Sequence, residues 1–160
     1  MAKSTQKWPG PEYHVQTVFR APLAYVFSWC TDYDPDDARR ERDHYARRII
    51  RRAGRRVVFE DLADSGGGWS WSRFTVSLLP PDHWHCESVG SHRDLTLDYH
   101  LTPLPGDRTR LDLRWKRRRT ALGEGRLSKR TVERATTAGW RHFAHELEKD
   151  YRRSRTGRGR

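Results

Sequence analysis

One stretch near the C-terminus decides the fold: SKRTVERATTAGWRHFAHELEKDY, residues 128–151. Its apolar positions recur at spacings of three and four, which places them on one face of an α-helix. They are Val132, Ala135, Gly139, Trp140, Phe143, Leu147 and Tyr151. Ser128 is a suitable N-cap residue for this helix. A helix with two bulky aromatic side chains on one face must bury that face, and a sheet is the partner of matching size.

The chain before this helix alternates apolar and polar residues, as antiparallel strands with one buried face do. The predicted strands cover residues 12–19, 44–52, 55–62, 69–79, 83–89, 95–101 and 111–115. Pro22 is suited to begin a short helix after the first strand, and the acidic residues before position 40 favour a second short helix at 35–40. This order predicts an α+β fold.

The stretch 69–79 contains two apolar sets in opposite phase. Trp69 and Trp71 share one phase, and the other phase holds Phe74, Val76 and Leu78. A regular strand cannot turn both sets inward. Either a β-bulge lies near residues 72–73, or the two Trp side chains cover the outer face of the sheet.

The composition indicates one folded domain with a basic surface. The chain has 160 residues, a formal charge of +11 and seven Trp residues. This charge favours acidic partners such as nucleic acid, an anionic membrane surface or acidic small molecules. The Arg residues are scattered along the predicted strands, however, which is typical of a solvated surface. We therefore expect a domain at 12–151, a flexible lead at 1–11 and a disordered basic tail at 152–160.

The cysteines and the hydropathy pattern predict a cytoplasmic protein. Cys30 and Cys86 show no metal-binding spacing, which argues against a disulfide framework or a zinc site. The N-terminal residues contain no apolar signal-peptide region, and no apolar run has the length of a membrane span.

Several short motifs resemble the SRPBCC superfamily of START-like, helix-grip proteins, and within it the polyketide cyclase/dehydrase branch. The motifs are Val18–Pro22 followed by Val26, Phe27 and Trp29, then Cys30–Tyr33, Leu79–Asp82, Thr109–Leu111 and Trp140–Tyr151. The resemblance covers residues 12–151. It implies a curved antiparallel sheet of about six to seven strands wrapped on the long C-terminal helix, with two short helices after the first strand. It also implies a cavity between sheet and helix that holds lipids, polyketides or other hydrophobic molecules.

Two features depart from this superfamily: the chain is more basic, and its predicted interior is richer in Trp. The superfamily shares no catalytic residue, so the resemblance assigns none here.

Inward-facing aromatic residues are the leading candidates for a ligand site. Any one of them would ordinarily fill the core, but a wide sheet around one helix is difficult to fill completely. Gly139 would leave room beside the sheet. The candidate cavity residues are Tyr45, Trp71, Arg73, Trp84, Tyr99, Trp115, Gly139, Trp140 and Phe143.

Two clusters could be read as metal sites, and the sequence favours neither. His83 and His85 share a strand face, but no third ligand is evident beside them. The acidic segment 32–37 lacks the glycine and the distal glutamate of a calcium loop, so turn formation and helix capping are the better interpretation. We expect no metal and no cofactor.

The leading hypothesis is therefore the binding of a small hydrophobic or aromatic ligand, acidic ligands included. An alternative is a polyketide cyclase or aromatase that uses Tyr45, Arg73 or Tyr99 to steer an enolate or move a proton. No Ser-His-Asp or Cys-His arrangement is visible, so the catalytic residues stay unassigned. Binding of nucleic acid or of an anionic surface by the Arg-rich exterior is a further, less favoured alternative. The sequence assigns no oligomeric state.

Overall fold

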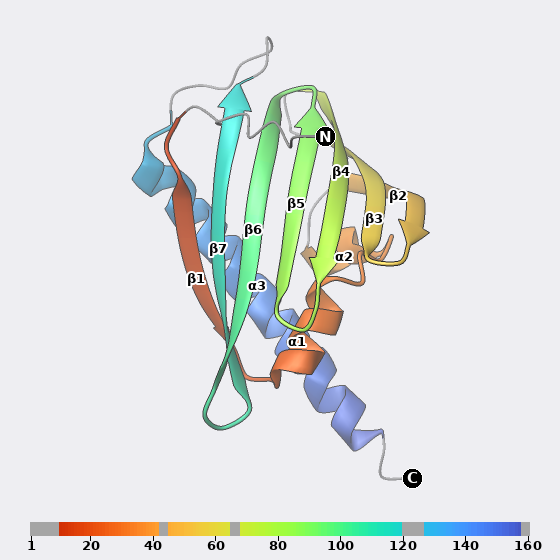
Figure 1. Ribbon diagram of the computed structural model, residues 1–160, viewed down its shortest axis with the longest axis vertical. Helices are drawn as coiled ribbons and strands as arrows, with labels where there is room; N and C mark the ends of the chain where they lie inside the picture. Colours follow the sequence, from red (N-terminus) through yellow and green to blue (C-terminus); the bar gives the residue numbers. More distant parts are fainter. Residues whose placement is uncertain (1–9, 42–44, 65–67, 120–126, 158–160) are drawn as a thin grey trace, which may run out of the picture.

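A computed structural model describes residues 10–41, 45–64, 68–119 and 127–157. Its centre is a curved sheet of seven strands in the order β1-β7-β6-β5-β4-β3-β2 (Figure 1). All neighbouring strands are antiparallel. The strands are β1 (Tyr13–Phe19), β2 (Tyr45–Ala53), β3 (Arg56–Asp64), β4 (Trp69–Leu79), β5 (His83–Gly90), β6 (Arg93–Leu104) and β7 (Arg108–Arg119).

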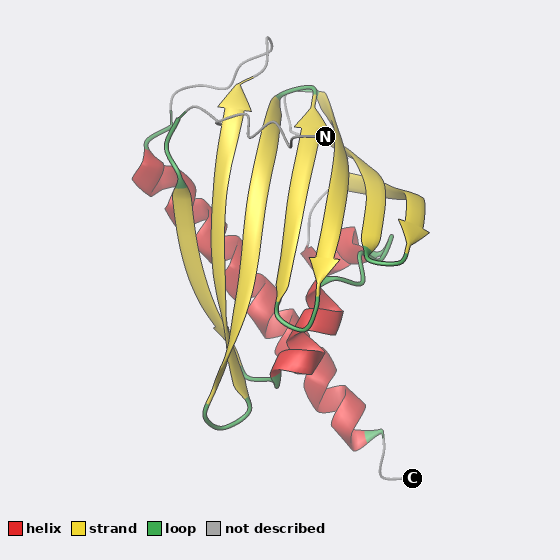
Figure 2. Cartoon of the chain, viewed as in Figure 1, coloured by secondary structure: helices red, strands yellow, loops and turns green. Residues whose placement is uncertain are grey.

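Three helices complete the described part of the chain. They are α1 (Leu23–Cys30), α2 (Asp37–Glu41) and α3 (Lys129–Thr156). Figure 2 shows all three on the same face of the sheet, which α3 crosses diagonally. The predicted α+β architecture, with two short helices after the first strand and a long C-terminal helix, is confirmed.

The N-cap of α3 forms as the sequence predicts. The Ser128 hydroxyl accepts a hydrogen bond from the backbone N–H of Thr131 at 3.1 Å. The C-terminal prediction is wrong by several residues, because the helix continues past Tyr151 to Thr156. Arg153 and Arg155 lie in its last turn, where positive charge interacts favourably with the helix dipole. The predicted disordered tail at 152–160 is therefore helical in its first part. Residues 1–9 of the predicted lead lie outside the described residues.

The buried face of α3 is narrower than the predicted apolar stripe. Leu147 is fully buried and Trp140 is half-buried, whereas Ala135 and Gly139 are exposed. Residues on an α-helix advance by about 100° each, so Gly139 lies about 80° and Ala135 about 120° around the helix from Leu147. The helix packs on the line through Leu147, and both small residues fall outside it.

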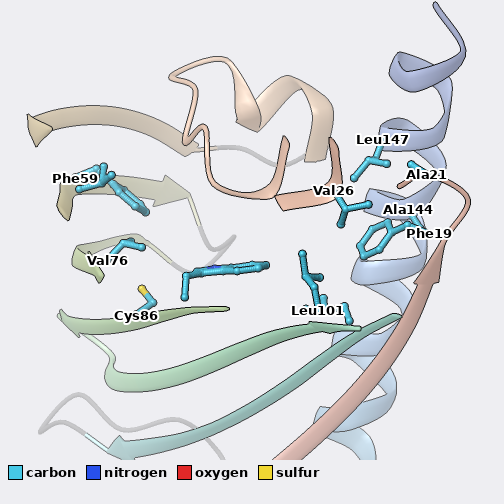
Figure 3. Close-up of a cluster of buried hydrophobic side chains, with 12 residues drawn as sticks. Phe19, Ala21, Val26, Phe59, Val76, Cys86, Leu101, Ala144 and Leu147 are labelled. Carbon is cyan, nitrogen blue, oxygen red and sulfur yellow. The ribbon is translucent and has the colours of Figure 1, made fainter. Parts of the chain in front are cut away.

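The main core packs α1 and α3 against the sheet. Figure 3 shows Ala144 and Leu147 of α3 beside Val26 of α1 and Phe19 of β1, with strand side chains such as Phe59 further along the cluster. A second, smaller cluster lies between β1, β7 and α3. It consists of Tyr13, Val15, Leu113 and Trp115, with the Tyr13 and Trp115 rings stacked at 5.0 Å.

Glutamates of α3 also bind the backbone of the edge strand β1 and of the residue that follows it. Glu133 accepts a hydrogen bond from the backbone N–H of His14 at 2.8 Å, and Glu148 accepts one from that of Arg20 at 2.9 Å. These bonds satisfy backbone donors that an edge strand would otherwise leave unpaired. The helix is thereby fixed to the sheet through polar contacts as well as through the core.

The two apolar sets of β4 point to opposite faces of a regular strand. The pairing of β4 with β3 and β5 shows no register shift, so of the two alternatives left open by the sequence, the bulge at 72–73 does not form and the outward Trp side chains are confirmed. Trp69 and Trp71 lie on the outer face and are 67% and 38% exposed. A register shift occurs instead in β2, between Ile49 and Arg51.

A candidate ligand cavity with an ionic end

A cavity of about 270 Å³ lies between the concave face of the sheet, α1 and α3. Most of the residues that line it are aromatic. The lining consists of Trp29, Cys30, Tyr33, Asp37, Arg47, Phe59, Asp61, Phe74, Trp84, Cys86, Tyr99, Trp140 and Phe143.

Cross-strand pairing aligns the aromatic wall on the sheet side. Phe59 of β3 lies opposite Phe74 of β4, and their rings stack with centroids 4.8 Å apart. Trp84 of β5 lies opposite Tyr99 of β6, with centroids 4.6 Å apart. Such pairs face the same side of a sheet, so their inward orientation follows from the register.

The helices provide the opposite wall. The Trp140 and Phe143 rings of α3 have centroids 5.2 Å apart, and Trp140 meets Tyr99 edge to face at 6.0 Å. Trp29 of α1 contacts Phe143, and its indole N–H donates a hydrogen bond to Asp150 at 3.1 Å. This bond satisfies the polar atom of Trp29 and leaves its ring at the cavity.

One end of the cavity is ionic. Arg47 of β2 lies opposite Asp61 of β3, and its Nε and Nη2 atoms each donate to one oxygen of that carboxylate at 2.9 Å. Its Nη1 atom donates to Asp37 of α2 at 2.6 Å. The Arg47 side chain is only 7% exposed, and each carboxylate is 14% exposed. The guanidinium also lies 4.3 Å from the centroid of the Phe59 ring.

Burial changes the protonation behaviour of this end of the cavity. Burial raises the pKa of Asp37 to about 6, and the charges of Asp32 and Asp34 raise it further, whereas those of Arg47 and Arg40 oppose the shift. Burial alone would lower the pKa of Arg47, but its hydrogen bond to Asp61 raises it overall. Arg47 therefore stays protonated, and Asp37 exchanges a proton close to neutral pH.

Other polar groups of the lining are held in their neutral forms. Burial raises the pKa of the Cys30 thiol, the Cys86 thiol and the Tyr33 hydroxyl. Both cysteines are free thiols.

The acidic segment 32–37 makes a turn as predicted, and its carboxylates also contact Arg40. Asp34 accepts a hydrogen bond from the backbone N–H of Asp36 at 2.8 Å, which is a turn contact. Arg40 lies 3.5 Å from Asp32, 3.9 Å from Asp34 and 3.3 Å from Asp37. The segment therefore surrounds one Arg with carboxylates next to the cavity.

The structure brings four of the nine predicted cavity residues together. Trp84, Tyr99, Trp140 and Phe143 all line the cavity. Tyr45 instead lines a separate open groove near Trp69, and Trp115 belongs to the second core cluster.

The other three predicted residues do not face the cavity. Trp71 and Arg73 lie in the outward phase of β4, where Arg73 pairs with Glu60 at 2.6 Å. Gly139 is exposed, and a Cβ atom added there would meet nothing within 4 Å. It therefore makes no room beside the sheet.

Sequence reasoning missed the ionic residues Asp37, Arg47 and Asp61. The available signal was the hairpin around Gly54, which places residues near 47 opposite residues near 61. The register shift at Ile50 changes which residues face inward, and nothing in the sequence pattern revealed it. Arg47 shares the inward phase of Tyr45 and Ile49, whereas the phase reverses beyond the shift and turns Arg52 inward.

A second cavity, of about 220 Å³, lies on the other side of Tyr99 and Trp140. Both residues line the two cavities, so their rings form the wall between them. Trp115 and Leu113 line this second space, which is thus bounded by β6, β7 and α3.

The predicted histidine pair lies on the outer face of the sheet. His85 bonds Asp98 through Nδ1 at 2.8 Å, and the His83 ring stacks on His100 with centroids 4.0 Å apart. Within the described ranges, no group of three or more His, Cys, Asp or Glu side chains is arranged to hold a metal ion. Nor does any helix in the described part of the chain combine the length and apolar character needed to cross a bilayer.

Neither protein-family models nor curated proteins match this sequence. Solved structures do match its fold. TTHA0849 from Thermus thermophilus superimposes with a TM-score of 0.69 at 16% identity, over 87% of this chain and 95% of the other. A START superfamily protein from Mycobacterium smegmatis gives 0.67 at 16% identity, over 88% and 97%. The Zhui aromatase/cyclase from Streptomyces sp. R1128 gives 0.65 at 13% identity, over 89% and 94%. The fold that the sequence motifs implied is thereby confirmed.

Proposed function

We propose that this helix-grip chain binds a small hydrophobic or aromatic molecule in the cavity between the sheet and α3. The observation that supports this is a cavity that stays open although eight of its thirteen lining residues are aromatic. Sites for drug-sized ligands usually have volumes of about 300–1,000 Å³. A cavity of about 270 Å³ suits a ligand smaller than these, with one ring or two fused rings.

The wall geometry suits a flat ligand. The stacked pair Trp84–Tyr99 on the sheet side and the Trp140–Phe143 pair on α3 offer ring faces and edges from two directions. Offset-stacked and edge-to-face aromatic contacts each add about 0.5–1.5 kcal/mol beyond simple burial. Two or three such contacts, together with burial of the ligand's apolar surface, suffice for micromolar binding.

Calorimetric titration with 1-naphthylmethanol tests this proposal. We expect wild-type protein to bind the probe, and Cys86→Phe to weaken binding at least about tenfold because the new ring occupies the cavity. Val89→Phe is the matched control, since Val89 lies on the same strand but is 51% exposed on the outer face. The proposal fails if the wild type binds neither this probe nor a charged naphthyl analogue, or if both variants bind as the wild type does.

A specific observation favours a second candidate, a cyclase or aromatase acting in the same cavity. Asp37, with a pKa raised by burial to about 6, could take a proton next to a ligand carbonyl, and Tyr99 lines the same space. Arg73, which the sequence suggested as a catalytic residue, lies on the outer face of the sheet and therefore cannot act in the cavity.

Cyclisation of a linear poly-β-ketone, followed by absorbance of the aromatic product, tests the enzyme hypothesis. The expected result is a rate above that in buffer, reduced about 10²-fold or more in Asp37→Asn. A wild-type rate equal to the buffer rate would exclude it.

A further inference from the structure

The cavity carries a charge opposite to that of the whole chain. The chain has a formal charge of +11. Among the described residues that line the cavity, the charged ones are Asp37, Arg47 and Asp61, two carboxylates with one guanidinium. With both carboxylates ionised, this set has one negative charge in excess.

The next residues outward preserve that excess. Asp32 and Asp34 add two carboxylates, and Arg40 adds one guanidinium that contacts both. The Arg52 guanidinium also lies beside this acidic segment and donates to the backbone carbonyl oxygen of Asp32 at 2.5 Å. Over these described side chains and the three in the lining, four carboxylates still face three guanidinium groups. Burial raises the pKa of Asp32; the charge of Arg40 opposes this shift and that of Asp34 adds to it.

Arg47 is not placed to anchor an acid. Three of its five N–H groups already donate to Asp37 and Asp61 in good geometry. The other two N–H groups belong to a guanidinium whose charge Asp37 and Asp61 already balance, so a ligand carboxylate that accepted from them would lie next to two other carboxylates. Like charges this close together in a buried site repel each other.

The carboxylates, by contrast, retain acceptor capacity. Each ionised carboxylate can accept about four hydrogen bonds. Asp61 accepts two from Arg47, and Asp37 accepts one from Arg47 and one from Arg40. A ligand N–H donor can therefore be added without breaking an existing contact.

The aromatic wall also suits a cation. Ring faces attract positive charge within about 6 Å of their centroids. Arg47 already shows this preference in the cavity, with its guanidinium 4.3 Å from the centroid of Phe59 and 5.9 Å from that of Tyr33. Trp84, Tyr99 and Trp140 offer further rings to a second cation or to the body that carries it.

We propose that the cavity selects a protonated amine carried on a small aromatic body. The ammonium group lies beside Asp37 and Asp61, and the aromatic body lies between the sheet rings and α3. This inference rests on the proposed ligand-binding function and specifies its ligand class. It differs from the expectation, based on net charge, that acidic molecules are among the ligands.

Three probes with one ring system and different charges test the inference. They are 1-naphthylmethylamine, 1-naphthylmethanol and 1-naphthoate, titrated into the full chain by calorimetry near neutral pH. We expect the amine to bind at least about tenfold more tightly than the alcohol, and the carboxylate most weakly. Binding of the alcohol or the carboxylate as tightly as the amine would overturn the charge inference and leave the proposed function standing. If none of the three binds, the proposed function fails, and the inference fails with it.

A matched pair of variants locates the effect. Asp61→Asn removes one carboxylate from the cavity, and Glu60→Gln removes one from the adjacent residue of β3, whose side chain pairs with Arg73 and Arg48 on the outer face. We expect Asp61→Asn to reduce the preference for the amine over the alcohol to about threefold or less, and Glu60→Gln to leave it unchanged. An equal loss in both variants would assign the preference to overall charge and overturn the inference. Asp37→Asn provides the same test from α2 if Asp61→Asn does not fold.

Discussion

Replacing Asp37 with Asn should change how the stability of the fold depends on pH. Burial raises the pKa of Asp37 to about 6, above the value of about 3.9 for an unfolded chain. The folded state therefore binds the proton more tightly than the unfolded state. The stability that this proton contributes is complete below about pH 4 and is lost as pH rises through about 6.

The magnitude follows from the difference between the two pKa values. A difference of about two corresponds to about 3 kcal/mol, and partial solvent screening reduces this to about 1–2 kcal/mol. The charged groups that face Asp37 are Asp32 and Asp34 before α2, Arg40 on α2 and Arg47 on β2. All four remain in the variant, so their own titration largely cancels when the two proteins are compared.

Urea unfolding of both proteins between about pH 4.5 and pH 7.5 measures the effect. The free energy of unfolding of the wild type, minus that of Asp37→Asn, should fall by about 1–2 kcal/mol across this range. The same substitution at the exposed neighbour Asp36 is the control, and its difference from the wild type should not follow this course. A difference for Asp37→Asn that stays constant, or that rises with pH, would show that the two arginines outweigh burial and would refute the reasoning.

Three substitutions in and beside α3 test its packing, each by chemical denaturation. Ser128→Ala should destabilise the fold by about 1 kcal/mol, because the Thr131 N–H loses its capping oxygen; no change would mean that the cap contributes nothing. Gly139→Ala should stabilise the fold by about 0.5–1 kcal/mol, because the position is exposed and open; destabilisation would place residue 139 on the buried face. Leu147→Ala should cost about 2–5 kcal/mol, because this side chain is fully buried; a cost below about 1 kcal/mol would contradict the packing of α3 on the sheet.

Local periodicity was enough to predict most of the fold. In β6 and β7 the alternation of Leu97 and Tyr99, and of Leu111 and Leu113, reports one buried face, and the observed pairing of these strands agrees with it. The same reasoning found Trp84 and Tyr99 in the cavity, because both lie in the inward phase of regular strands. Periodicity has this power wherever the sheet is regular, since each side chain's face then follows from its position alone.

Periodicity failed where a single residue interrupts the alternation. Arg52 pairs with Val57 on the inward face, and an unbroken strand would then turn Arg47 outward. The shift between Ile49 and Arg51 reverses this and places Arg47 opposite the inward-facing Asp61. The two halves of β2 therefore predict opposite orientations for Arg47, and the hydrophobic pattern of this strand is too weak to decide between them, because most of its positions are exposed.

Net charge and the charge of the cavity point to different ligands, because they act over different distances. Exposed arginines act on a ligand through water and salt, which screen charges over about 8 Å at physiological ionic strength. A ligand in the cavity is governed by the nearest buried ions, and these are Asp37, Arg47 and Asp61. The charge of +11 describes the surface that a partner first meets, whereas the pairing of β2 with β3 and the position of α2 determine the charge inside. A basic surface and an acidic cavity can therefore coexist in one small domain, and the naphthyl probe series distinguishes between them because only the cavity can enclose the ring.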